Sequence, residues 1–254
     1  MKKVVICLGT GRCGTLSMAK LLEKKGGDVS HEQYRHPWKT DIDVLYNSTV
    51  NLLTRDGDFV GDSGYYWLNY AQEMLRVFPN LRFVCLKRDK NEVIESFNRR
   101  TPNANWWTSP KSKHWDWVEY ILDTRMYLFP KYDLPKKEAI GEYWEDYYRI
   151  ANSLERLYGG LFKIFDFKYV LNTEEGQKEL FNFLDLDGTT YLGIKQNTEK
   201  KRVKVVEEFY GAVEGIGCGR CNGEAKWTIK CKPIVCHSCD ECKEETITFL
   251  KGGE

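Results

Sequence analysis

The sequence contains no apolar run that approaches the ~20 residues required for a membrane-spanning helix. Its first apolar stretch, residues 4–8, is also shorter than the ~7–15 residues of a secretory signal-peptide core. We therefore expect a soluble protein that has no membrane span and is located in the cytoplasm.

The sequence also lacks an excess of either charge, because 38 lysines and arginines stand against 37 aspartates and glutamates. A balanced charge gives no general reason to expect a nucleic-acid partner, although a local basic patch would be compatible with it. Internal repeats and low-complexity tracts are absent as well. The length of 254 residues suits one sizeable domain with a small appendage.

What the sequence does contain is an alternation of short apolar segments with amphipathic ones. Strands are predicted at 2–8, 28–32, 58–63, 81–88 and 161–167, and helices at 15–25, 69–80, 89–100, 142–159 and 173–186. Residues 101–140 are rich in aromatic side chains, contain proline and stay unassigned. Strands that alternate with helices predict an α/β fold with a parallel sheet flanked by helices.

Residues 9–14, Gly-Thr-Gly-Arg-Cys-Gly, connect the first predicted strand to the first predicted helix and fit the spacing G-x-x-x-x-G. Glycines permit a tight turn there, and backbone amides at the start of a helix bind anions. A nucleotide-triphosphate loop continues with Lys and Ser or Thr, which bind the β- and γ-phosphates and magnesium. This chain has Thr15 and Leu16 instead, and it carries a cation inside the loop at Arg12. The pattern predicts a phosphate-like ligand held without magnesium, and a turn that binds nothing is the alternative.

A second candidate anion site follows the fourth predicted strand. Arg88 lies at the end of that strand, and Ser96 lies two turns into the next helix. Ligands of parallel sheets bind at the carboxyl ends of the strands, so we expect Arg88 to share a rim with the first loop. Two anion sites on one rim suit a donor that carries phosphates on both sides of a ribose.

These motifs resemble those of the sulfotransferases that use 3′-phosphoadenosine 5′-phosphosulfate (PAPS) as the donor. The stretch GTGRCGTLS (9–17) resembles their 5′-phosphosulfate loop, in which many members carry lysine at the position of Arg12. The stretch CLKRDKNEVIESF (85–97) resembles their 3′-phosphate motif, and 161–188 resembles their late strand and helix. The donor-binding residues that this resemblance implies are Gly9, Thr10, Gly11, Arg12, Cys13, Gly14, Thr15, Leu16, Arg88 and Ser96.

The resemblance implies a nucleotide-kinase-like fold and transfer of a sulfo group to an acceptor hydroxyl, with an amine as the alternative acceptor and a carbohydrate as one candidate. Adenosine 3′,5′-bisphosphate would be the donor product, and Arg12 with the loop amides would stabilise charge on it as it leaves. The chain departs from the family at Asp62 in GDSGYYW, where members often carry a lysine. The alternative functions are a small P-loop kinase and a non-catalytic nucleotide-binding protein with a docking module.

The general base that removes the acceptor's proton is expected among His31, Glu32, Asp62 and His114. His31 and Glu32 follow the first predicted helix, where a second parallel strand would end at the active rim. Because successive side chains on a strand point to opposite faces, only one of the two is expected to face the donor. The stretch SHEQYRHP (30–37) resembles the region in which glycan sulfotransferases place a glutamate base, which favours Glu32 over His31.

Nine cysteines are present, and six of them lie within residues 218–242. An odd total with one dense cluster favours a reducing compartment and a metal site over a disulfide scaffold. The stretches CGRC (218–221) and CHSCDEC (236–242) have the spacing of zinc knuckles. The predicted ligands of a structural Zn²⁺ are Cys218, Cys221, Cys236 and Cys239, with Cys231, His237 and Cys242 as alternatives.

Glycines and cysteines become frequent after about residue 210, and the domain boundary is predicted there. Residues 1–210 would form the sulfotransferase-like α/β domain, and residues 211–254 would form a zinc-ribbon-like module. The role of this module is open among a structural cap, recognition of the acceptor and docking of a protein partner.

We predict that the purified protein contains about one Zn²⁺ per chain. Cys218→Ser or Cys221→Ser should lower the zinc content and unfold residues 211–254 before the rest of the chain, since metal binding and folding are coupled in such small modules. Metal analysis measures the first effect. A freshly purified protein that holds no metal and has intact disulfides in this segment would contradict the prediction.

Overall fold

The computed structural model describes residues 2–34, 36–38, 41–101, 104–114 and 128–194, together with four short strands beyond residue 215. The chain divides into two compact units, one of Met1–Asp116 with Arg125–Gln196 and one of Trp117–Thr124 with Asn197–Glu254. The domain boundary near residue 210 stays a prediction from composition.

Five parallel strands form the sheet of the first unit, in the order β2-β3-β1-β4-β5. Their bounds are Lys3–Leu8 (β1), Gly27–His31 (β2), Phe59–Ser63 (β3), Leu81–Lys87 (β4) and Phe162–Asp166 (β5). The register pairs Cys7 of β1 with Ser63 of β3 and with Val84 of β4. All five carboxyl ends therefore lie along one edge, and the predicted α/β fold with a parallel sheet is confirmed.

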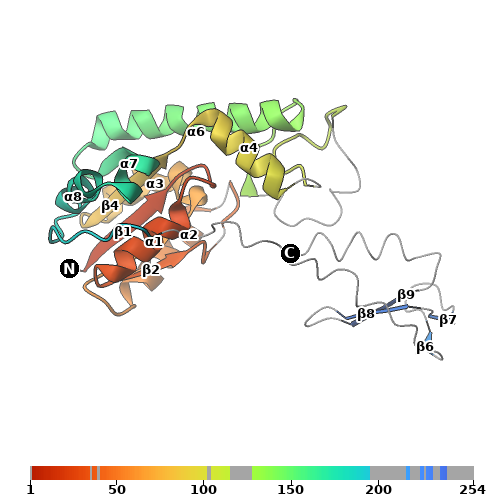
Figure 1. Cartoon of the computed structure of the whole chain (residues 1–254), viewed down its shortest axis with the longest axis horizontal. Helices are drawn as coiled ribbons and strands as arrows, with labels where there is room; N and C mark the ends of the chain where they lie inside the picture. The colour runs from red at the N-terminus through yellow and green to blue at the C-terminus, as the bar shows by residue number, and fades with distance from the viewer. Residues whose placement is uncertain are drawn as a thin grey trace. The chain divides into compact units, whose positions relative to one another are not determined.

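Helices cover both faces of this sheet (Figure 1). The helical elements are α1 (Thr15–Lys24), α2 (Ile42–Leu53), the 3₁₀ helix η1 (Tyr65–Tyr70), α3 (Ala71–Val77), α4 (Lys90–Arg100), α6 (Lys136–Tyr158), α7 (Phe167–Asn172) and α8 (Glu174–Phe183). None of the helices in the described part of the chain is long and apolar enough to cross a membrane.

The two faces of the sheet carry separate hydrophobic cores. Val4, Ile6 and Leu8 of β1 point into a core with α2, η1, α3, α4 and α6. Val5 and Cys7 point into the opposite core with α1, α7 and α8. This alternation is the two-residue period of a strand that is buried on both faces.

Several helical elements differ from the sequence-based expectation, and neither η1 nor α7 was predicted. Helix α2 lies in a stretch for which no element was predicted, and its first turn is capped by the Asp41 side chain, which accepts from the N–H of Asp43. Helix α6 begins directly after Pro135 rather than at 142 and continues through the buried Gly141. A Cβ at Gly141 would lie 3.2 Å from Cε of Lys90 on α4. The absence of a side chain at Gly141 therefore lets the two helices approach closely.

The described strands of the second unit form two antiparallel pairs. Strand β6 (Ile216–Gly217) pairs with β7 (Glu224–Ala225), and β8 (Trp227–Lys230) pairs with β9 (Val235–Ser238). The stretch CGRC (218–221) lies in the chain between the paired strands β6 and β7.

Candidate active site

The loop between β1 and α1 places three glycines where the backbone turns. Gly11 and Gly14 have φ angles of 84° and 87°, which L side chains rarely adopt, and Arg12 between them has φ 58°. Gly14 is the N-cap of α1 and has no side chain that could cap the helix. The first-turn amides of α1 therefore receive no hydrogen bond from a capping side chain at residue 14. Uncapped amides at the start of a helix are groups that bind anions.

Two side chains of the loop point into the protein. Thr10 and Cys13 are fully buried, and a Cβ placed on Gly9 would lie 2.1 Å from Sγ of Cys13. Burial raises the pKa of the Cys13 thiol to about 12. Thr10 and Cys13 are both predicted donor-binding residues, and they can therefore offer only their backbone groups to a ligand.

The two predicted anion motifs lie against each other. The Arg12 Nε donates to Oγ of Ser96 on α4 at 3.1 Å. The Arg88 Nη1 donates to the Arg12 carbonyl oxygen at 2.7 Å, and its Nε donates to Oε2 of Glu92 at 2.9 Å. Residues 76 positions or more apart in the chain thus form one hydrogen-bonded group at the carboxyl ends of β1 and β4.

Positive charge accumulates around Arg12. Burial lowers the pKa of the Arg12 guanidinium most, and the charges of Arg100 and then Arg88 lower it further. The charge of Glu32 acts in the opposite direction and favours protonated Arg12. A partly buried guanidinium beside two further arginines would be stabilised by a bound anion.

His31 and Glu32 both lie next to the loop. The Nε2 of His31 lies 3.0 Å from Oγ1 of Thr15, the first residue of α1, and 4.0 Å from Oε1 of Glu32. Strand β2 ends at His31, and Glu32 adopts φ 52°, outside the strand conformation. The strand alternation that was expected to separate the two side chains therefore does not apply at Glu32.

Asp62 is fully buried and saturated with donors. Its Oδ1 accepts from Oγ of Ser30 at 2.6 Å and from the N–H of Gln33 at 3.4 Å. Its Oδ2 accepts from the Tyr66 hydroxyl and from Nε1 of Trp67, the latter at 2.8 Å. A carboxylate held in this way is part of the support of the site. Its oxygens are not available to remove a proton from an acceptor.

The remaining predicted site residues are His114 and the predicted zinc ligands. His114 is exposed, and its backbone N–H donates to Oγ of Ser112 at 3.1 Å. Of the predicted zinc ligands, Cys236 lies on strand β9 with the alternative His237, and the others fall outside the described residues. Among the residues that are described, no group of three or more His, Cys, Asp or Glu side chains is arranged to hold a metal ion.

Helix α6 contributes site contacts that were not predicted from the sequence. The hydroxyls of Tyr143 and Tyr147 bond to the backbone of the β1–α1 loop, and Trp144 and Tyr148 bond to the end of β4. The sequence signal is the spacing of four residues between Tyr143 and Tyr147, which places both on one face of a helix.

The comparisons with known proteins point to one family. A family model described as "Sulfotransferase domain" matches residues 4–188, which extend from β1 past the end of α8. A search of curated proteins finds no significant match.

Asp62→Asn should lower the free energy of unfolding by about 1–3 kcal/mol, because an amide nitrogen would face two of the four groups that now donate to the carboxylate. Urea denaturation measures the change. Asp28→Asn is the matched control, since the Asp28 side chain is 51% exposed on the neighbouring strand β2, and it should change stability by less than about 0.5 kcal/mol. If both variants lose the same free energy of unfolding, Asp62 does not have the structural role assigned to it.

Proposed function

The chain belongs to the sulfotransferase family, and we propose that it transfers a sulfo group from PAPS to an acceptor hydroxyl. The observation that carries the donor assignment is the bond between Arg12 of the β1–α1 loop and Ser96 of α4. This bond joins the two predicted anion motifs, one for the 5′ side of the ribose and one for the 3′ side. A P-loop kinase is disfavoured because Thr15 and Leu16 replace the Lys and Ser or Thr that bind phosphates and magnesium.

Each half of the donor has its own set of ligands in this proposal. The guanidinium of Arg12, the Thr15 hydroxyl and the first-turn amides of α1 bind the 5′-phosphosulfate. Arg88 and Ser96 bind the 3′-phosphate and so fix the register of the nucleotide. The positive charge gathered at Arg12 supports this assignment, because a doubly anionic ligand would compensate it.

The chemical step is an in-line displacement at sulfur. The acceptor oxygen forms a bond to sulfur while the bond from sulfur to the 5′-phosphate oxygen breaks, and that oxygen keeps the electron pair. Adenosine 3′,5′-bisphosphate leaves with the added negative charge, which Arg12 and the loop amides stabilise. Positioning and charge stabilisation supply most of the rate enhancement in transfers of this kind.

Glu32 is our proposed general base, and His31 is its neighbour. The carboxylate of Glu32 lies within electrostatic range of Arg12, and its Oε1 lies 4.0 Å from Nε2 of His31. His31 is already engaged with Thr15 at 3.0 Å. We assign removal of the acceptor's proton to Glu32 and orientation of Thr15 to His31.

The finer properties of the acceptor and of the second unit stay proposals. A carbohydrate is a candidate acceptor because of the glycan-sulfotransferase-like stretch around Glu32. A zinc module is proposed from the cysteine spacing of CGRC (218–221) and CHSCDEC (236–242), which is typical of zinc knuckles. The free, buried Cys7, Cys13 and Cys85 are compatible with a reducing, cytoplasmic location.

We predict that adenosine 3′,5′-bisphosphate raises the melting temperature without added metal, because a ligand that binds only the folded state stabilises it. Arg88→Ala should remove most of this shift. It should weaken the binding of adenosine 3′,5′-bisphosphate more than the binding of AMP. Thermal unfolding with each ligand measures both effects. Arg82→Ala is the control, since it removes the same charge near the other end of β4.

Two results would contradict this assignment. An equal loss of adenosine 3′,5′-bisphosphate and AMP binding in Arg88→Ala would remove Arg88 from the 3′-phosphate site. Stabilisation by ATP with magnesium, and not by adenosine 3′,5′-bisphosphate, would favour the kinase.

Glu32→Gln should keep donor binding and lower turnover by about 10²–10⁴-fold, the usual loss for a general base. His31→Asn should have a smaller effect because it removes only the partner of Thr15. Initial rates on an acceptor identified in a panel of hydroxyl compounds measure turnover, and thermal shift with adenosine 3′,5′-bisphosphate measures donor binding. Turnover of Glu32→Gln near the parental rate would exclude Glu32 and make His31 the next candidate.

A further inference from the structure

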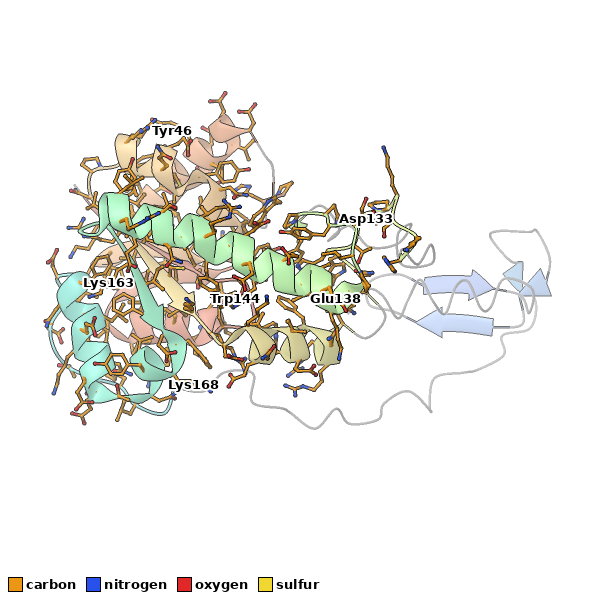
Figure 2. The ribbon with its side chains drawn as sticks, turned by 90° about the horizontal axis from the view of Figure 1, so that it is seen from above. Tyr46, Asp133, Glu138, Trp144, Lys163 and Lys168 are labelled. Atoms are coloured by element: carbon orange, nitrogen blue, oxygen red, sulfur yellow. The ribbon has the colours of Figure 1, made fainter. Side chains whose placement is uncertain are left out.

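We infer that helix α6 positions the donor loop through two hydrogen bonds with the loop backbone: the Tyr147 hydroxyl accepts from Gly9, and the Tyr143 hydroxyl donates to Thr10. The inference rests on the proposed function for the role of the loop. Neither tyrosine would touch the donor, so both are positioning residues. The helix runs the length of the first unit, with Trp144 near its middle (Figure 2).

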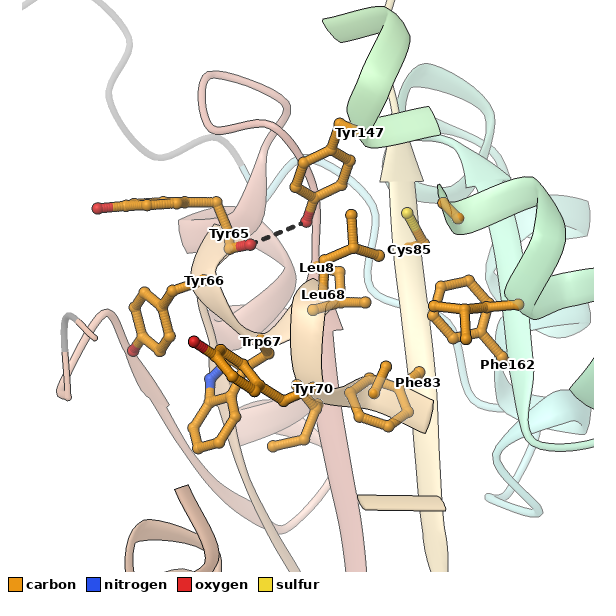
Figure 3. Close-up of a cluster of buried hydrophobic side chains, with 14 of the residues drawn as sticks. Leu8, Tyr65, Tyr66, Trp67, Leu68, Tyr70, Phe83, Cys85, Tyr147 and Phe162 are labelled. Atoms are coloured by element: carbon orange, nitrogen blue, oxygen red, sulfur yellow. Dashed lines mark hydrogen bonds between the residues drawn. The ribbon is translucent and has the colours of Figure 1, made fainter. Parts of the chain in front are cut away.

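Tyr147 connects two of the strand ends that meet at the site. Its hydroxyl accepts from the N–H of Gly9, the first residue after β1, at 2.9 Å and donates to the carbonyl oxygen of Tyr65 in η1 at 3.2 Å. Figure 3 shows the Tyr147 side chain extending from α6 toward Tyr65, with Leu8 beside it. One buried oxygen atom thus joins the start of the donor loop to the segment that follows β3.

Tyr143 and two neighbours extend the same arrangement. The Tyr143 hydroxyl donates to the carbonyl oxygen of Thr10 at 3.1 Å. In the adjacent row of the helix, Trp144 Nε1 donates to the carbonyl oxygen of Arg88 at 2.9 Å, and the Tyr148 hydroxyl donates to that of Leu86 at 2.7 Å. The Tyr143 and Tyr147 row therefore contacts the end of β1, and the Trp144 and Tyr148 row contacts the end of β4.

The hydrogen bonds of Tyr143 and Tyr147 are fully buried and are made by neutral groups. Tyr143 and Tyr147 have no exposed surface, and burial raises the pKa of each hydroxyl well above its usual value, so each can both donate and accept. A buried backbone group that loses its partner cannot recover a bond from water. Phenylalanine would fill nearly the same space as tyrosine, yet it would leave the Gly9 N–H without its partner.

The loop has a functional reason to need external support. Gly11 and Gly14 give it positive φ angles and little intrinsic stiffness, while its amides must stay aimed at one ligand. A displacement of about 1 Å in a positioning group can reduce a rate by about 100-fold. Hydroxyls from a helix of 23 residues fix the first two loop positions from outside the loop.

The test compares Tyr147→Phe with Tyr132→Phe in the full-length protein. Tyr132 also bonds to α6, through Oδ2 of Asp146 at 2.9 Å, but not to the loop. In the ligand-free protein, amide hydrogen exchange of residues 9–14 should be about 10-fold faster in Tyr147→Phe and unchanged in Tyr132→Phe. The Kd for adenosine 3′,5′-bisphosphate and the KM for PAPS should rise about 10-fold to 100-fold in Tyr147→Phe alone.

The opposite results overturn the inference. If Tyr147→Phe loses thermal stability but matches Tyr132→Phe in loop exchange and in Kd, Tyr147 has only a packing role. Should Tyr147→Phe fail to fold, Tyr143→Phe is measured in its place, because it removes only the contact with Thr10 and leaves Gly9 paired. Unchanged loop exchange and Kd in that variant would overturn the inference equally.

The exchange measurement also separates this inference from the proposed function, because it needs no ligand. If the parental protein does not bind adenosine 3′,5′-bisphosphate, the donor assignment fails. The exchange rates of the loop in the two variants still decide whether α6 holds it in place.

Discussion

The central position of β1 in the sheet is the constraint on which the site depends. β1 pairs with β3 on one side and with β4 on the other, so the loop that leaves it lies between the ends of both neighbours. The approach to β3 is close, because a Cβ on Gly61 would lie 2.0 Å from the carbonyl oxygen of Val5. Parallel pairing then brings groups from three strand ends together at a single edge: Arg12 after β1, His31 at the end of β2 and Arg88 after β4.

The fold and the positions of the two loops within it could be predicted because their signals are local. Apolar runs such as 81–88 predict buried strands whatever surrounds them, and the glycine spacing of 9–14 predicts a tight turn between a strand and a helix. The register of a parallel sheet then requires Arg12 and Arg88 to lie near each other. The two loop motifs resemble those of sulfotransferases, and the family match over residues 4–188 agrees with that resemblance.

The rest of the site depends on contacts between distant residues. Asp62 looks like a candidate base in the sequence, and only its burial among Ser30, Tyr66 and Trp67 reveals a supporting role. Glu32 itself has a left-handed backbone conformation and therefore breaks the strand pattern. Hydrophobic periodicity does not predict such a residue. The hydroxyls of α6 reach the loop across more than 130 positions of sequence. Helical spacing can identify their shared face but not what that face contacts.

The burial of Cys13 has a chemical consequence for the loop between β1 and α1. With a pKa of about 12, the thiol is ionised at neutral pH in on the order of one molecule in 10⁵. Its sulfur packs against Gly9 and away from solvent. Alkylating reagents, peroxide and disulfide exchange all act on the thiolate, so the donor loop should be inert toward them. Cys13 thus serves as a small apolar side chain within the loop, and the loop is insulated from the redox state of its surroundings.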